Sequence, residues 1–245
     1  MSALAVLLIA VGIGDVCRRL IDARWAAPMA AVVSIAACLL LAALWHPGDL
    51  LLLIVAAVSS VAWLLLCDRA ERTAKHQALP LTVFGGAVST LILLSGLGTD
   101  VGGLVGRWLA WVGYATSPNR ALMVVGVLLV QLATANQVVR LVLGSVGAVK
   151  PAGQPQASDQ LKGGRLLGPM ERLLIVGLGL AGQLTLATAV VAAKSIIRFP
   201  EISAKRDKNG TPERVGIDDV TEYFLVGSFA SWMLAFGALA LVAAT

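Results

Sequence analysis

The sequence predicts an all-α integral membrane protein with about seven transmembrane helices and one short interfacial helix. Hydrophobic residues make up 58% of the 245 residues and charged residues only 13%, which excludes an ordinary soluble domain. Several apolar runs reach the length of about 18 residues that a membrane-crossing helix needs. The sequence also lacks the alternation of polar and apolar residues that is typical of barrel strands. Within lipid, helices satisfy their own backbone hydrogen bonds.

The first four helices are expected within residues 1–97, at the start of a single polytopic domain that covers residues 1–245. Each is an apolar segment bounded by charged or turn-forming residues. Proline opens the second and fourth segments, where its missing N–H is not needed. The four segments are 3–17, 27–45, 50–67 and 80–97.

An aspartate, Asp15, stands near the end of the first segment and is followed by Arg18 and Arg19. A carboxylate at membrane depth is costly, whereas one beside two arginines is readily accommodated at the membrane surface. We therefore interpret Asp15 as an interfacial residue. The alternative is that it lines the helix bundle.

Residues 98–119 predict a short helix that lies in the membrane interface. Apolar residues recur on one face of this glycine-containing segment, and two of them are tryptophans, which favour the depth of the headgroups. The alternative is that residues 101–116 cross the membrane as an eighth span, which would reconcile the distribution of Lys and Arg among the loops. The residues on the apolar face are Leu104, Trp108, Trp111 and Val112.

The C-terminal half is expected to contain three longer helices and two polar loops. The loop before the sixth helix is rich in Pro, Gly and Gln, and the loop after it is charged. In order, the predicted segments are helix 5 at 120–147, a flexible loop at 148–170, helix 6 at 171–199, a charged loop at 200–219 and helix 7 at 220–243.

Polar side chains recur along one face of the predicted sixth helix. Arg172, Gln183 and Lys194 follow one another at intervals of 11 residues, close to three helical turns, so their directions drift by only about 20° per step. An ionisable side chain at membrane depth costs at least about 2.5–3.5 kcal/mol. We therefore expect this face to turn toward protein or water.

These residues and their neighbours define a basic polar seam between helices 5, 6 and 7. Cations outnumber acids there, which favours an anionic group such as a lipid phosphate or a carboxylate. The alternative is that the arginines extend toward the headgroups from helix ends and the acids cap the helix dipoles. The candidate anion- or lipid-binding residues are Asn136, Arg140, Arg172, Gln183, Lys194, Ser195, Arg198 and Tyr223, and their charge partners are Glu171 and Glu222.

The last helix carries a ridge of small residues, Gly227, Ser231 and Ala235, spaced every four residues. Such a ridge lets another helix approach closely. We expect it to pack on a helix of the same chain, of a protein partner or of a second copy.

No catalytic signature accompanies the seam. His46 and His76 stand apart from any set of residues with metal-ligand spacing, and no GxSxG, HExxH or P-loop motif occurs. Lys194 and Ser195 point about 100° apart on a helix, which is poor geometry for a nucleophile and its base. We expect no catalytic residue, no metal and no cofactor. The net charge of +5 comes from short loops and does not indicate nucleic acid.

The residues "GGRLLGPMERLLIVGLGLAGQ", "AAKSIIRF" and "EYFLVGSFAS" resemble the C-terminal region of an uncharacterised family of multi-pass bacterial membrane proteins. The family pattern runs G-R-L-I-G, E-R…A-G-Q, A-A-K-S-x-x-R-F and E-Y-x-x-G-T. The likeness covers residues 163–231, and Ser228 stands where the family has Thr. The resemblance implies residence in a bacterial plasma membrane and supplies no reaction.

Three function classes remain open. The favoured one is a protein that binds or transports an anionic lipid or solute through the polar seam, with membrane lipids as partners. The second is an accessory or scaffold subunit of a membrane complex, which would contact a protein partner or a second copy through the last helix. The third is a membrane-embedded enzyme that acts on a lipid phosphate.

Overall fold

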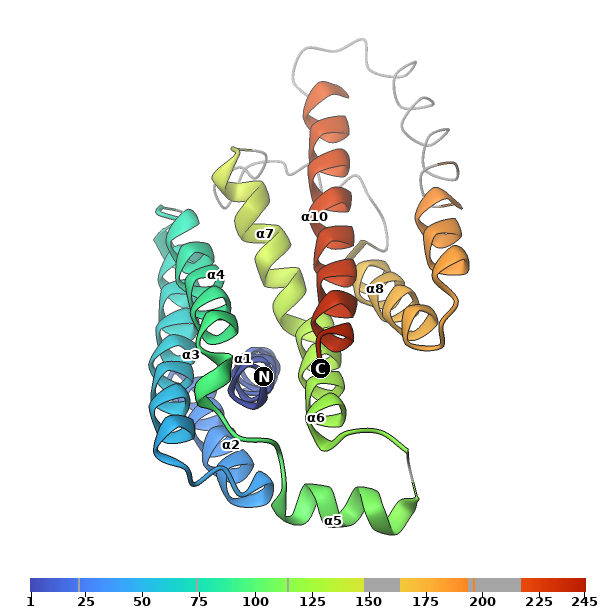
Figure 1. Cartoon of the computed structure of the whole chain (residues 1–245). Helices are drawn as coiled ribbons and strands as arrows, with labels where there is room; N and C mark the ends of the chain where they lie inside the picture. Colours follow the sequence, from blue (N-terminus) through green and yellow to red (C-terminus); the bar gives the residue numbers. More distant parts are fainter. Residues whose placement is uncertain (22, 74, 114, 148–163, 194–195, 197–216) are drawn as a thin grey trace. The chain divides into compact units, whose positions relative to one another are not determined.

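The computed structural model describes residues 1–21, 23–73, 75–113, 115–147, 164–193, 196 and 217–245 (Figure 1). Every secondary-structure element within these residues is a helix, which confirms the all-α fold class for this part of the chain. Three helical runs are long and apolar enough to cross a bilayer, which is compatible with a membrane location. The total of seven spans stays a prediction. The three runs are Pro47–Thr73, Pro118–Ser145 and Tyr223–Ala243.

The chain divides into two compact units. One comprises residues 1–134 together with 240–245, and the other comprises residues 135–239. The boundary at residue 134 falls inside the run Pro118–Ser145, where a π-helical segment ends. The sequence predicted a single domain and did not indicate this division.

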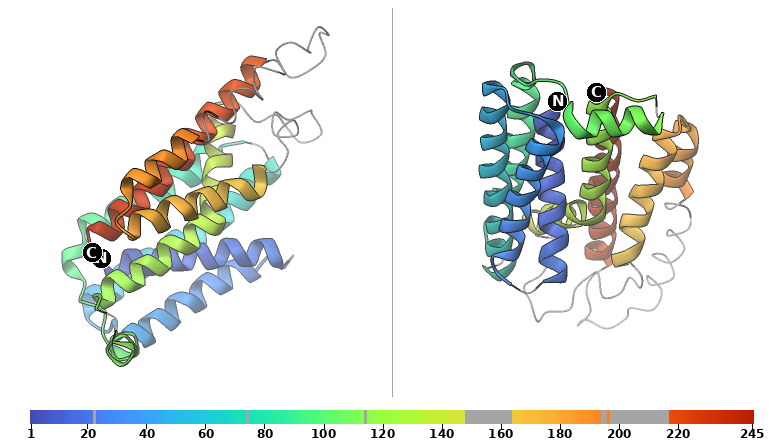
Figure 2. Two further views of the ribbon diagram at one scale, coloured as in Figure 1. Left: turned by 90° about the vertical axis from the view of Figure 1, so that its right-hand side faces the viewer. Right: turned by 90° about the horizontal axis from the view of Figure 1, so that it is seen from below.

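Helix α1 (Ser2–Leu20) is the centre of the first unit. Helices α2 (Ala26–Ala42), α3 (Pro47–Thr73) and α6 (Pro118–Leu129) all pack against it, and Figure 2 shows it in dark blue between α3 and α6. Its residues from Ala3 to Val11 are at most 5% exposed. A helix that is apolar on every side is typically buried among others, so this helix forms the core of the unit.

Glycines allow α1 and α6 to approach closely. A Cβ atom at Gly12 would lie 2.7 Å from the Cβ of Leu129, and one at Gly126 would lie 2.9 Å from the carbonyl oxygen of Ala5. Small residues at such crossings are characteristic of helix packing in membranes.

The outward faces of α2, α3 and α4 (Ala78–Leu93) are apolar, whereas several polar side chains of this unit are buried. Soluble monomers rarely expose apolar surface on this scale. The distribution is compatible with contact to lipid. The apolar side chains that are more than half exposed include Met29, Val33, Leu40, Leu51, Ile54, Val58 and Leu93.

Helix α5 (Gly103–Val112) corresponds to the predicted interfacial helix, and a short 3₁₀ turn, η1 (Ser95–Leu97), precedes it. Its 10 residues span about 15 Å, half the thickness of the hydrocarbon core. The helix is thus shorter than a helical crossing needs, and whether residues 101–116 form an eighth span stays a prediction. Trp108 and Trp111 are 59% and 84% exposed, and the interfacial position of this helix stays a prediction.

Several helix ends differ from the predicted ones. Helix α3 extends beyond its predicted end to Thr73, because the charged residues that follow the apolar run remain helical. In these last turns, Arg72 donates a hydrogen bond to Asp68 one turn earlier. The predicted fifth helix is observed as α6, the π-helical segment η2 (Val130–Thr134) and α7 (Ala135–Ser145) in one continuous run.

The predicted single helix at 171–199 is wrong. Helix α8 begins at Gly164, inside the predicted loop, and ends at Leu180. A turn follows, in which Gly182 has a φ of +76°, a left-handed conformation that glycine adopts without steric cost. A second helix then covers Leu184–Ala193.

The last helix of the second unit, α10 (Ile217–Ala243), begins three residues before the predicted start. The predicted loops at 148–170 and 200–219 lie mostly outside the described residues. Their described parts, 164–170 and 217–219, belong to α8 and α10.

Candidate functional site

A buried arginine joins three helices of the second unit. Arg172 of α8 is 1% exposed. Its Nη2 donates to Oδ1 of Asn136 on α7 at 2.5 Å, and its Nη1 donates to Oγ of Ser231 on α10 at 3.0 Å. We call these three residues the Arg172 cluster. Asn136 and Arg172 were both candidate binding residues from the sequence, and the structure brings them into direct contact.

A second polar pair lies beside this cluster. The indole Nε1 of Trp232 donates to Oε1 of Glu171 at 2.9 Å, and Glu171 is 8% exposed. Two successive residues of α8 are thus bonded to two successive residues of α10. This double pairing fixes the register between the two helices.

Glycines make room for the cluster. A Cβ atom at Gly168, one turn before Arg172, would lie 3.5 Å from Nη1 of the arginine and 3.7 Å from Oδ1 of Asn136. Gly227 of α10 faces α7. A Cβ atom at Gly227 would lie 3.5 Å from a methyl group of Leu143 on α7. Ser231 and Ala235 are buried, so the small-residue face of α10 is covered.

Of the other predicted seam residues, the structure describes the side chains of three. Arg140 and Gln183 are exposed, and Tyr223 is half-buried. The alignment of Gln183 with Arg172 on one helix face is wrong, because the spacing of 11 residues aligns side chains only on an unbroken helix, and α8 ends at Leu180. Lys194, Ser195 and Arg198, and the side chain of Glu222, lie outside the described residues.

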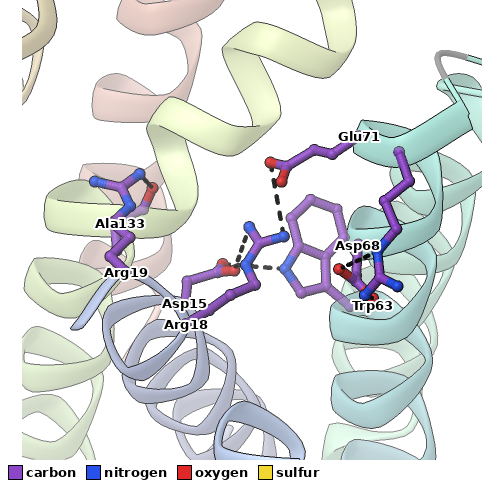
Figure 3. Close-up of polar contacts among 8 residues, drawn as sticks. Asp15, Arg18, Arg19, Trp63, Asp68, Glu71 and Ala133 are labelled. Atoms are coloured by element: carbon purple, nitrogen blue, oxygen red, sulfur yellow. Dashed lines mark hydrogen bonds and ion pairs between the residues drawn. The ribbon is translucent and has the colours of Figure 1, made fainter. Parts of the chain in front are cut away.

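A second buried polar network lies in the first unit, and it was missed from the sequence (Figure 3). Asp15 of α1 is 0% exposed. Its Oδ1 accepts from Nη2 of Arg18 at 3.1 Å, and its Oδ2 accepts from Nε1 of Trp63 on α3 at 3.1 Å. The interfacial interpretation of Asp15 is therefore wrong, and the alternative, a position inside the bundle, is the observed one.

Arg18 links this buried carboxylate to a more accessible one. Its Nη1 lies 3.7 Å from Oε1 of Glu71 near the end of α3. The side chains of Asp15, Arg18 and Glu71 are 1%, 19% and 37% exposed, so exposure rises along the series. We call these three residues the Asp15 relay. Asp68 and Arg72 form a separate exposed ion pair on the same helix.

The π-helical segment η2 borders the Asp15 relay. Arg19 donates from Nη2 to the backbone carbonyl oxygen of Ala133 at 2.7 Å. Thr134 is 0% exposed, and its Oγ1 has no hydrogen-bond partner among the described residues. π-Helical turns inside α-helices are frequent at functional sites.

One sequence signal for this network existed. Asp15 is the only charged residue among the first 17, and an arginine follows it at the i+3 position. Its main neighbour across the helix interface, Trp63, is 48 residues away, and no local pattern reports that contact. Within the described residues, no group of three or more His, Cys, Asp and Glu side chains is placed to hold a metal ion.

Comparison of the chain with protein-family models, with curated proteins and with solved structures finds no match. The resemblance of residues 163–231 to a bacterial membrane family therefore stays a prediction. The chemistry of the Arg172 cluster and of the Asp15 relay therefore follows from the residues of each site alone.

Proposed function

We propose that this chain is a multi-pass membrane protein that binds an anionic lipid or solute at the Arg172 cluster. The observation that carries the proposal is the guanidinium group of Arg172, which is 1% exposed and donates to uncharged oxygens of two other helices. Burying a charge is expensive unless it is matched. The two neutral acceptors fix the position of the guanidinium, and its positive charge attracts an anion.

The geometry of the guanidinium favours an oxyanion as the ligand. Arginine presents five N–H donors in a rigid plane that matches phosphate and carboxylate groups. Asn136 and Ser231 engage Nη2 and Nη1 and so set the orientation of this plane. Gly168 adds no side chain on the helical turn next to Nη1, which favours access for a ligand.

The proposed membrane topology has seven spans. It combines α1 to α4, the run Pro118–Ser145, α10, and one segment made of α8 and Leu184–Ala193, two helices that fold back on each other (Figure 2). Broken helices are tolerated at membrane depth where they border protein or a cavity, and transporters use them at binding sites. Helix α5 lies in the interface through Trp108 and Trp111.

Native mass spectrometry of the detergent-solubilised protein tests the proposal. Phosphatidylglycerol, an anionic lipid, should bind more tightly than phosphatidylcholine, which has no net charge. Arg172→Gln should weaken phosphatidylglycerol binding about tenfold or more, since a hydrogen bond to a charged group contributes about 1.5–3 kcal/mol. Arg107→Gln, which removes an exposed arginine of α5, is the matched control and should change little.

A further variant covers the case in which Arg172→Gln does not fold. Ser231→Ala keeps the charge and removes one neutral acceptor of the guanidinium, so it should weaken binding by less than Arg172→Gln. Equal binding of both lipids by the wild type, or equal losses in Arg172→Gln and Arg107→Gln, would overturn the anion site.

A further inference from the structure

We propose that Asp15 is a proton-binding site at which the carboxyl group exchanges its ion pair with Arg18 for a proton. The site lies in the first unit, and the inference does not depend on the anion site at Arg172. Ionisable residues inside membrane proteins often serve in proton relays, and the contacts around Asp15 supply the parts that such an exchange needs.

The first part is a cation with two carboxylates within reach. Arg18 lies 3.1 Å from Asp15 through Nη2 and 3.7 Å from Glu71 through Nη1 (Figure 3). A small movement of one guanidinium group is enough to transfer its hydrogen bond from the buried carboxylate to the accessible one. Glu71 thus provides Arg18 with a partner when it leaves Asp15.

The charges of the relay balance with one added proton. With Asp15 and Glu71 ionised and Arg18 protonated, the three side chains carry a net charge of −1. A proton from water bonds to Oδ1 of Asp15 as Arg18 leaves, and the guanidinium pairs with Glu71. The relay is then neutral, and no unpaired charge remains in the interior, where it would be costly.

The second part is a hydroxyl group that can accept from the protonated carboxyl group. Thr134 is 0% exposed, belongs to η2, which packs against α1, and its Oγ1 has no hydrogen-bond partner among the described residues. A buried polar group without a partner costs about 1–3 kcal/mol. The O–H of protonated Asp15 can donate to this oxygen, so the proton-bound state satisfies both groups.

Arg18 is the cation that bonds to Asp15, and the other charged side chains nearby have contacts of their own. Arg19 is directed to the carbonyl oxygen of Ala133, and Arg72 is paired with Asp68. From α3, Trp63 donates to Oδ2 and remains able to do so after Oδ1 is protonated. Helix α2, which also packs on α1, contains no Asp, Glu, Lys or Arg.

Infrared spectroscopy of the full-length protein in lipid vesicles tests the site. As the pH is lowered from about 8 to about 4, the band of protonated carboxyl groups should contain a component that Asp15→Asn removes. Asp68→Asn, which removes an exposed carboxylate of α3, should leave that component in place. A spectrum of Asp15→Asn that equals the wild-type spectrum would overturn the proposal.

Two further variants keep the test decisive where Asp15→Asn does not fold. Thr134→Val removes the proposed acceptor while preserving side-chain shape, and it should shift the frequency of the Asp15 component. Arg18→Gln removes the competing cation and should increase the protonated fraction at each pH. An unchanged carboxyl band in both variants contradicts the exchange, because a purely structural Asp15–Arg18 pair has no protonated form to perturb.

Discussion

The indole nitrogen of Trp63 donates a hydrogen bond to the buried carboxylate of Asp15 at a distance of 3.1 Å. Trp63 is itself 0% exposed, and its ring lies 5.0 Å from that of Phe84 in a tilted arrangement. One side chain of α3 thus contacts both the central helix α1 and the outer helix α4. This bond fixes the rotation of α1 about its axis, since any other rotation would move Asp15 away from its donor.

We predict that Trp63→Phe destabilises the first unit. Phenylalanine keeps an aromatic ring beside Phe84 but removes the donor to Asp15, and a hydrogen bond to a charged group contributes about 1.5–3 kcal/mol. Thermal unfolding followed by circular dichroism measures the effect. Trp25→Phe is the control, because Trp25 is 66% exposed. A loss of stability no larger than in this control would show that the bond contributes little.

A second prediction concerns the packing of α10 on α7. Gly227→Leu places a branched side chain where even a Cβ atom would lie 3.5 Å from Leu143, and overpacking of this kind costs about 1–3 kcal/mol. The melting temperature of the purified protein should fall, and size-exclusion chromatography of the same sample measures its oligomeric state. Gly237→Leu, on the same helix but with no neighbour within 4 Å, should leave both unchanged. If Gly227→Leu behaves like Gly237→Leu, then Gly227 is not a packing residue.

Local patterns predicted most of the helices and part of the Arg172 cluster. Apolar runs mark helices wherever backbone hydrogen bonds must be satisfied internally, and all the described elements are helical. Asn136 and Arg172 were identified because a polar side chain in an apolar run is conspicuous. Ser231 was assigned to packing alone, since nothing in its own helix reports that an arginine 59 residues away donates to it.

Other features depend on backbone geometry or on distant contacts. The run of apolar residues continues through Gly182, so hydropathy did not reveal the turn that its positive φ makes. The π-helical segment Val130–Thr134 has the composition of an ordinary helix. Asp15 was placed at the interface because its local sequence shows the nearby arginines but not Trp63.

We predict an ion pair between Glu222, a charge partner of the polar seam, and Lys194 or Arg198. Glu222 lies in the second turn of α10, and Lys194 and Arg198 precede the charged loop in the sequence, so antiparallel neighbours would bring the carboxylate level with both cations. Reversing one charge in Glu222→Lys or Lys194→Glu should lower the melting temperature, and the double variant should restore it. We also expect Lys194→Ala to weaken phosphatidylglycerol binding more than Arg198→Ala, since the sequence predicts Lys194 one turn deeper than Arg198. No rescue by the double variant would refute the pairing.

The last prediction separates two glycines of the same segment by their backbone conformations. Gly182 has a φ of +76°, and a residue with a Cβ atom in the left-handed region costs about 1–2 kcal/mol. Gly182→Ala should therefore lower the melting temperature, or favour an unbroken helix through Leu180 and Leu184.

Gly177 lies within α8, and a Cβ atom at this position would have no neighbour within 4 Å. Alanine is favoured over glycine inside a helix by about 0.5–1 kcal/mol, so Gly177→Ala should leave stability unchanged or raise it. Circular dichroism distinguishes the two outcomes for Gly182→Ala, because a continuous helix increases the helical signal and a strained turn does not. Equal melting temperatures for the two variants, with no change in helical signal, would show that the turn at Gly182 does not depend on glycine.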